Sequence, residues 1–90
     1  MAIVRIPEAL LKFTAGQSEL VIEIHSLPQL SRSLLKVVPQ LHSIVFTPSG
    51  KLCGFVNLYL DGQLISSKLD QPVLLTAESK IDLVAAVSGG

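Results

Sequence analysis

The sequence predicts an α+β fold in which one main helix packs on a mixed sheet of four to five strands. The chain has 90 residues, enough for one small domain with an adequate core. Hydrophobic residues make up 49% of it and charged residues 16%, which distinguishes it from a disordered segment. Strand-like segments flank a single segment of helical period. The helix therefore forms the crossover between two hairpin-like units.

The first two strands are expected before the helix. Residues 2–6, AIVRI, are rich in β-branched side chains, and Pro7 ends this strand because proline cannot donate to a sheet ladder. A turn follows in FTAGQS, where Gly16 can adopt a positive φ. Residues 19–24, ELVIEI, then alternate inward and outward positions, which is typical of a half-buried strand. These segments together predict a hairpin.

The helix is predicted over residues 26–38. Ser26 and Gln29 have the spacing of a capping box, which satisfies free N–H groups at the start of a helix. Pro39 is expected to end or kink the helix near its last residue. Apolar residues at helical spacing predict one face that packs on the sheet. This predicted face consists of Leu27, Leu30, Leu34, Val37 and Val38.

The second half of the chain predicts three more strands after a loop over residues 47–51. Residues 55–60 form a strand, Asp61-Gly62 is a strong hairpin-turn signal, and residues 63–67 form the return strand. Residues 80–87, KIDLVAAV, alternate again and form the last strand. This order suits a β-grasp (ubiquitin-like) roll over residues 1–87, followed by a flexible tail of residues 88–90.

Charge and composition exclude some classes of partner. Seven basic residues balance seven acidic ones without a Lys/Arg cluster, so a nucleic-acid partner is not favoured. Cys53 is the single cysteine, which excludes an internal disulfide and fits a reducing compartment. The N-terminus lacks the pattern of a signal peptide, and the apolar runs are too short to span a bilayer. We therefore expect a cytoplasmic protein.

Candidate reactive residues have plain structural interpretations. Cys53 is expected to be a small packing residue, although a role in accepting sulfur stays open. His25 and His42 lack partners at ligand spacing, so no metal site is predicted. Lys51 and Lys68 are most simply solvated charges. Without a nucleophile motif, we predict no catalytic residue and no bound cofactor.

One ordered set of motifs resembles a known family. The stretch GKLCGFVNLYLDGQLI (50–65), followed after a spacer by IDLVAAVSGG (81–90), resembles the ubiquitin-like sulfur-carrier (MoaD/ThiS-like) proteins. These include the small subunit of molybdopterin synthase, the thiamin sulfur carrier and the carrier that serves a thiocarboxylate-dependent cysteine synthase. The matching features are FVN at residues 55–57, the Asp61-Gly62 turn and the Gly89-Gly90 pair. The resemblance covers nearly the whole chain.

The sequence also departs from the family pattern. Ala77-Glu78-Ser79 stands where an acidic-glycine turn is common, and Ala85 where a proline is common. These differences affect the local turn and the stiffness of the tail, and they leave the pathway open among cysteine, molybdopterin, thiamin and related sulfur metabolites. They do not affect the chemistry, which needs only a C-terminal carboxylate.

The resemblance implies a sulfur carrier, a protein co-substrate rather than an enzyme. An ATP-dependent adenylating enzyme would activate the carboxylate of Gly90, a sulfur donor protein would convert it to a thiocarboxylate, and a downstream synthase would use the sulfur. Ser88 and Gly89 would thread into the partner's narrow site with Gly90, where residues without a Cβ permit close approach. ATP would be used by the partner and not bound by this chain.

Apolar residues near the tail are candidates for a partner interface. We predict that Phe55, Val84 and Val87 contribute to it, although burial in the core is an equally good interpretation of these side chains. Two other functions stay open. One is a ubiquitin-like modifier joined through Gly90 to lysines of target proteins, and the other is a plain protein-interaction domain.

Overall fold

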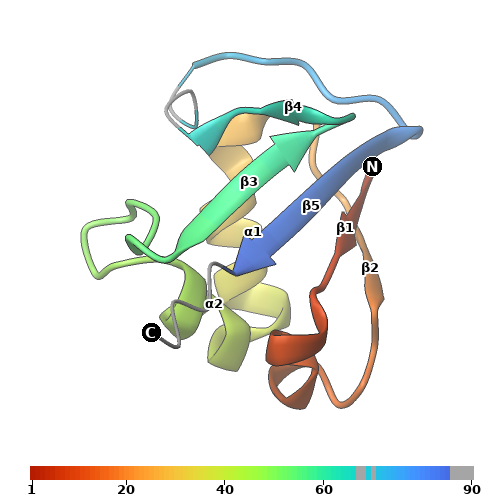
Figure 1. Cartoon of the computed structure of the whole chain (residues 1–90). Helices are drawn as coiled ribbons and strands as arrows, with labels where there is room; N and C mark the ends of the chain where they lie inside the picture. Colours follow the sequence, from red (N-terminus) through yellow and green to blue (C-terminus); the bar gives the residue numbers. More distant parts are fainter. Residues whose placement is uncertain (67–68, 70, 86–90) are drawn as a thin grey trace.

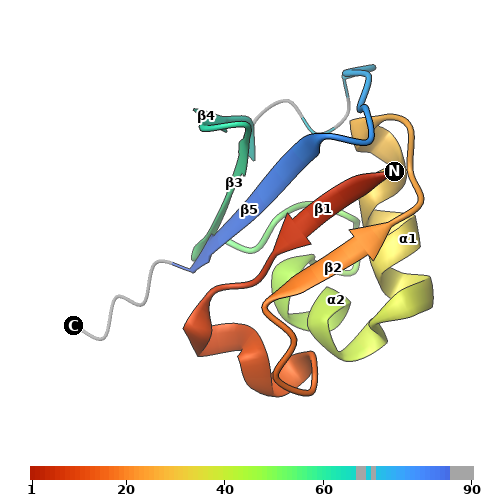
Figure 2. The same ribbon diagram turned by 90° about the vertical axis from the view of Figure 1, so that its right-hand side faces the viewer.

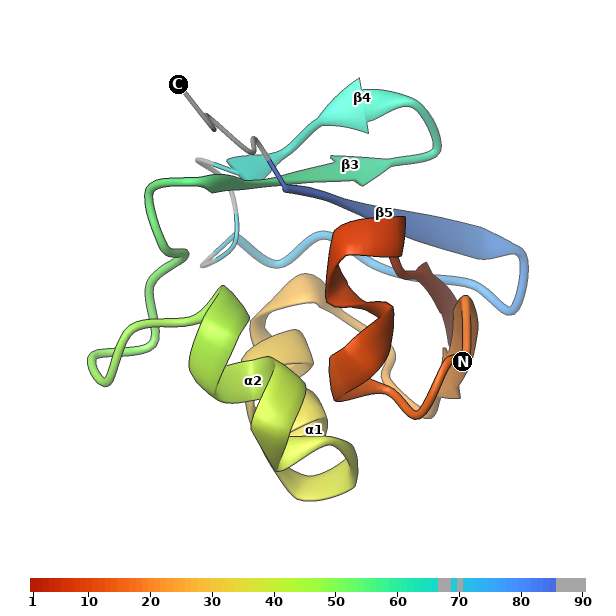
Figure 3. The ribbon, with the colours of Figure 1, turned by 60° about the horizontal axis from the view of Figure 1, so that its bottom comes forward.

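The computed structural model describes residues 1–66, 69 and 71–85 of the chain. One twisted sheet carries the helices on a single face (Figures 1 and 3). The elements in chain order are β1 (Ala2–Arg5), the 3₁₀ helix η1 (Glu8–Phe13), β2 (Glu19–Ile22), the 3₁₀ helix η2 (Leu27–Gln29), α1 (Leu30–Val37), α2 (Pro39–Val45), β3 (Val56–Leu60), β4 (Gln63–Leu64) and β5 (Ser79–Ala85).

The sheet has five strands in the order β2-β1-β5-β3-β4 (Figure 2). β5 lies at its centre, parallel to β1 and antiparallel to β3, while β1 and β3 pair antiparallel with β2 and β4. Because β1 and β5 are parallel, the chain must cross the sheet between them, and helices supply that crossover. The predicted α+β, β-grasp roll with a mixed sheet is confirmed.

The core fills the space between the sheet and the helices. Alternate strand residues point into it, as the period of two requires. From the strands these are Ala2, Val4, Leu20, Ile22, Val56, Leu58, Ile81 and Leu83, all buried. Leu27, Leu30, Leu34, Leu41 and Val45 close the core from the helical side. Within the described residues, no helix is both long and apolar enough to cross a membrane.

We call the opposite side of the sheet the open face. It carries the outward-pointing residues of the strands: Ile3, Arg5, Glu19, Val21, Asn57, Tyr59, Leu64, Lys80, Asp82 and Val84. The helices leave this side uncovered (Figure 3).

The predicted N-terminal hairpin is confirmed, with a longer connection than expected. β1 and β2 pair from Ala2 opposite Ile22 to Arg5 opposite Glu19. Gly16 has φ 82°, as the turn prediction required, and Ala15 before it is also left-handed at 54°. The pattern did not predict η1, which is anchored to the core through a buried leucine.

The helical segment begins as predicted. The Gln29 side-chain oxygen accepts hydrogen bonds from the backbone N–H groups of His25 at 2.7 Å and Ser26 at 3.3 Å. This is the Gln half of the predicted capping box. The first turn is the 3₁₀ helix η2, and α1 continues from it.

Pro39 ends this helix, as predicted, and a second short helix, α2, begins at the proline itself. Proline is tolerated there because the first N–H of a helix has no intrahelical partner. The prediction that Val37 belongs to the buried face is wrong, since its side chain is 57% exposed. Val38 leaves the helix with φ −136° and ψ 72° and packs against the core in its place.

The predicted hairpin at Asp61-Gly62 is confirmed. Both residues are left-handed, with φ of 49° and 89°, as the primed two-residue turns require. The return strand β4 has only two residues, shorter than predicted. It ends early because the Ser66 hydroxyl accepts the Leu58 N–H at 2.9 Å, in place of the next carbonyl of the ladder.

Candidate functional site

The predicted tail follows the central strand of the sheet, β5. Ala85, the last described residue of β5, pairs with Val56 at the start of β3. Two neighbouring strands pair with β5: β1 with its first part, up to Asp82, and β3 with its later part, up to Ala85. The position from which the chain continues is therefore held by the ladder with β3. Val87 and the predicted tail residues Ser88, Gly89 and Gly90 lie outside the described residues. Their proposed roles stay predictions.

Two of the predicted interface residues lie at this same end of the sheet. Val84 is 42% exposed, because Leu83 before it points into the core and Val84 consequently points outward. Its Cα pairs with Asn57. Phe55, two residues before Asn57, is 44% exposed. Both apolar side chains therefore border the end of β5 without being part of the core.

An ion pair lies on the open face beside Val84. The Arg5 guanidinium donates Nη2–H to Oδ2 of Asp82 at 2.9 Å and Nε–H to the other carboxylate oxygen. The hydrogen bond to Asp82 and then its charge raise the pKa of Arg5 above its ordinary value. The fork geometry orients both side chains. The charges at the middle of this face are thus already paired with each other.

The sequence interpretation missed this pair because its members are 77 positions apart. A signal was present: both residues occupy outward positions, one on the first strand and one on the last. Only the parallel pairing of β1 with β5 brings Arg5 opposite Asp82. A shallow depression of about 350 Å³ lies around the pair, bordered by Pro7, Tyr59 and Val84 among others.

The described residues do not assemble a reactive cluster. In this part of the chain, no group of three His, Cys, Asp or Glu side chains is close enough to hold a metal ion. His42 binds the Ser31 hydroxyl through Nε2 at 2.9 Å and stacks on Phe46, so it contributes to helix packing. Cys53 is partly buried against the core, in line with its prediction as a packing residue. Lys51 is exposed.

Comparison with known proteins gives a consistent result at the level of structure. No protein-family model and no curated protein sequence matches the chain. A chain of the BexX/CysO complex from Amycolatopsis orientalis has a TM-score of 0.82 at 17% identity, over 100% of both chains. CysO of Mycobacterium tuberculosis, titled an antigen, has a TM-score of 0.79 at 22% identity, over 97% of this chain and 100% of its own.

A third structure, small archaeal modifier protein 1 from Methanosarcina acetivorans, has a TM-score of 0.76 at 25% identity, over 99% of this chain and 95% of its own. These neighbours are ubiquitin-like proteins of the sulfur-carrier type, and they are small carriers and modifiers rather than enzymes. The predicted resemblance is therefore confirmed at the level of fold.

Proposed function

We propose that this protein carries sulfur as a thiocarboxylate on Gly90 and delivers it to a biosynthetic synthase. The observation that carries the proposal is the position of β5. This strand is central in the sheet, its last residues pair with β3, and two exposed apolar residues, Phe55 and Val84, lie near its C-terminal end. The domain can thus be gripped by a partner while the segment after Ala85 enters that partner's site.

The chemistry needs activation because a carboxylate is a poor electrophile. In the proposed sequence, the Gly90 carboxylate attacks the α-phosphate of ATP in the partner's site and releases pyrophosphate. A donor persulfide then attacks the acyl-adenylate and displaces AMP. A thiol breaks the sulfur–sulfur bond and leaves the thiocarboxylate, whose sulfur is a good nucleophile at neutral pH. The chain itself supplies the carboxylate and the docking surface, as a co-substrate.

Docking energy must come from the folded domain. Fixing glycines costs more backbone entropy than fixing any other residue, so the tail alone binds weakly. Phe55 and Val84 offer apolar area that is free in the isolated domain, and the Arg5–Asp82 pair beside them is already satisfied. The Amycolatopsis orientalis neighbour is titled as a complex of two proteins, which supports a protein partner for this chain as well.

The test is activation of tail variants. Deleting Gly90, or adding one alanine after it, is expected to abolish ATP–pyrophosphate exchange with the activating enzyme of the native host. Adding one alanine before Met1 is the matched control, because it lengthens the chain equally at the other end. The circular dichroism and unfolding midpoint of all three variants should equal those of the parent. Normal exchange with either tail variant contradicts the proposal.

A second candidate function is conjugation to target proteins as a modifier. It is favoured by the likeness to small archaeal modifier protein 1. Both functions begin with the same adenylation, so the products distinguish them. A carrier isolated from its host should show the mass increase of one oxygen replaced by sulfur, whereas a modifier should appear as Gly90 joined to lysines. Conjugates with no sulfur-containing form would favour the modifier.

A further inference from the structure

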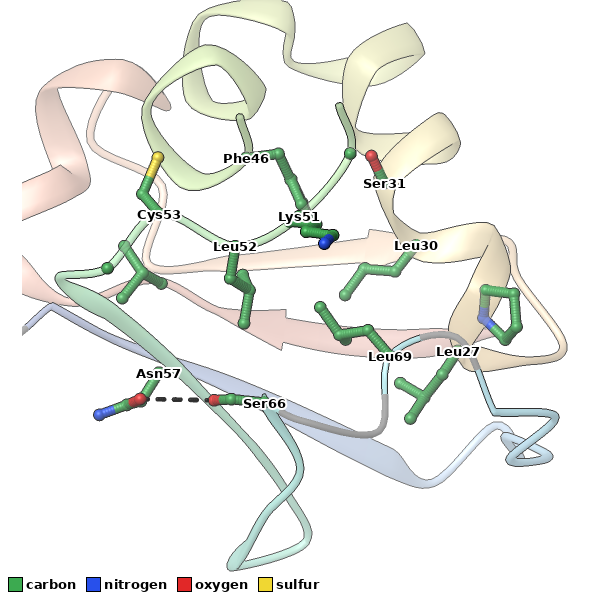
Figure 4. A pocket seen from close by; sticks show the side chains of 14 residues that line it. Leu27, Leu30, Ser31, Phe46, Lys51, Leu52, Cys53, Asn57, Ser66 and Leu69 are labelled. Carbon is green, nitrogen blue, oxygen red and sulfur yellow. Dashed lines mark hydrogen bonds between the residues drawn. The ribbon is translucent and has the colours of Figure 1, made fainter. Parts of the chain in front are cut away.

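A cavity of about 660 Å³ lies on the helical side of the sheet, and its lining extends to Asn57 of β3. Its walls come from four places: η2 and the start of α1, the loop between α2 and β3, the start of β3, and Ser66 and Leu69 after β4 (Figure 4). The volume falls within the range of about 300–1,000 Å³ that is usual for small-molecule sites. Nothing in the proposed sulfur chemistry uses this cavity.

The apolar part of the lining belongs to the core. Leu27, Leu30, Phe46 and Val56 line the cavity and are each less than 4% exposed. Side chains packed in a core keep their positions, because interiors are nearly as dense as organic crystals. This part of the cavity is therefore largely formed before any ligand enters, which lowers the entropy cost of binding.

The loop holds one cation at the rim. The Thr47 N–H donates to the Lys51 carbonyl at 2.6 Å, and the Gly50 N–H donates to the Thr47 carbonyl at 2.9 Å. Gly50 permits this tight turn with φ 86°. Phe46 and Leu52 then pair across the base of the turn. These bonds place the backbone of Lys51 beside the cavity.

Among the described residues that line the cavity, Lys51 is the one charged side chain, and none is acidic. Figure 4 shows this side chain directed from the loop toward the α1 side of the cavity, where Leu30 and Ser31 lie. The Cys53 sulfur points away from the centre (Figure 4), so thiol chemistry is not part of the argument. An apolar interior with one cation at its rim complements an amphipathic anion.

We propose that this cavity binds a small carboxylate with an apolar body, which packs on Leu30, Phe46 and Val56 while its carboxylate pairs with Lys51. Two other polar side chains of the lining are engaged: the Ser31 hydroxyl with His42 at 2.9 Å, and the Ser66 hydroxyl with the Leu58 N–H. Asn57 also lines the cavity, and its amide oxygen accepts a hydrogen bond from the Ser66 hydroxyl at 3.4 Å. The lining thus offers one cation and few other polar groups, which favours a ligand with one anionic group and a largely apolar remainder. This inference is independent of the proposed sulfur transfer.

The test is a titration of the whole protein, labelled with ¹⁵N, by two probes: 3-phenylpropanoate and octanoate. Each is paired with its neutral amide, which has nearly the same shape without the charge. Binding in the millimolar range or tighter should shift the amide resonances of residues 27–31 and 46–56 and leave those of β2 unchanged. Each carboxylate should bind about fivefold more tightly than its amide, which corresponds to the upper range for an ion pair open to solvent.

Lys51→Met keeps most of the side-chain length and removes the charge, so it should abolish the preference for the carboxylate while the amide still binds. Lys36→Met on the exposed side of α1 is the matched control and should leave the preference intact. The proposal is overturned if neither probe shifts these resonances at millimolar concentration, if the shifts scatter over the surface, or if Lys51→Met retains the full preference.

Discussion

The two faces of the sheet use the same strands for different purposes. On the covered face, Leu58, Ile81 and Leu83 are all buried by the helices. On the open face, the side chain of Val84 on β5 is 42% exposed and that of Val21 on β2 is 62% exposed. The covered face is nearly all aliphatic, whereas the open face interleaves apolar side chains with a salt bridge.

The covered face therefore stabilises the fold, and the open face is available to recognise a partner. Burial of aliphatic groups on one face drives folding, since it removes apolar surface from water. The open face contributes little to that burial, so its side chains can serve a partner at little cost to the fold. Substitutions on the two faces are therefore expected to affect different measurements.

The largest expected effect is on the covered face. Leu58→Ala removes a fully buried side chain from β3 and leaves a cavity between the sheet and the helices. We expect the free energy of unfolding to fall by about 2–5 kcal/mol. Urea unfolding followed by circular dichroism measures this loss. A change no larger than that of an open-face substitution would contradict the division between the faces.

A substitution in the hairpin turn should have an intermediate effect on the free energy of unfolding. It keeps Leu64 opposite Tyr59 on the open face, and its second residue, Gly62, has φ 89° with open space where a Cβ would lie. Gly62→Ala is therefore expected to cost about 1–2 kcal/mol through backbone strain alone. Gly54→Ala is the matched control: it also has open space, but its φ is outside the left-handed region. Equal losses in the two variants would show that strain is not the cause.

The Arg5–Asp82 pair should contribute less to the free energy of unfolding than the core or the turn. We expect a small favourable coupling in a double-mutant cycle of Arg5→Met and Asp82→Asn, because both side chains are partly open to solvent. High salt should weaken it. The raised pKa of Arg5 means that its contribution is present below the ordinary guanidinium pKa and is lost only above it. Neutral and mildly alkaline buffers should thus give the same coupling.

The smallest effect on stability is expected at Val84, where the functional effect should appear. Val84→Ser and Val21→Ser each change one exposed valine of the open face, and both should alter the free energy of unfolding by only about 0.5 kcal/mol. Val84 lies at the end of β5, so its substitution should slow ATP–pyrophosphate exchange about fivefold. Val21 lies on an edge strand, so its substitution should leave the exchange rate unchanged. Equal rates for the two variants would remove Val84 from the interface.

Much of the fold could be predicted because strong local signals agreed with one another. Pro7 and Pro39 ended their elements, and Asp61-Gly62 formed the hairpin turn. The extent of β4 could not be predicted, since a single side-chain contact decides it: the Ser66 hydroxyl accepts the Leu58 N–H that would have extended the ladder. The exposure of Val37 could not be predicted either, because it depends on where α1 ends and not on the spacing of apolar residues along the helix.

For the candidate site, the sequence left Val84 open between the exposed face and the core, and the structure places it outward, 42% exposed, next to the buried Leu83. The place of Phe55 beside the same strand end needed the pairing of β3 with β5, which joins residues nearly 30 positions apart. Gly89 and Gly90 stay predictions from the sequence, because they lie outside the described residues.

The sequence by itself determined the approximate positions of the strands and turns and the alternation along β2 and β5, because these depend on side-chain period and on the backbone limits of proline and glycine. Only the tertiary structure decided which strands are neighbours. That choice brings Arg5 to Asp82, sets the end of β5 beside the start of β3 and shapes the cavity beside Lys51. The physical reason is that contacts between distant residues form through the burial of the whole core, and no local pattern records them.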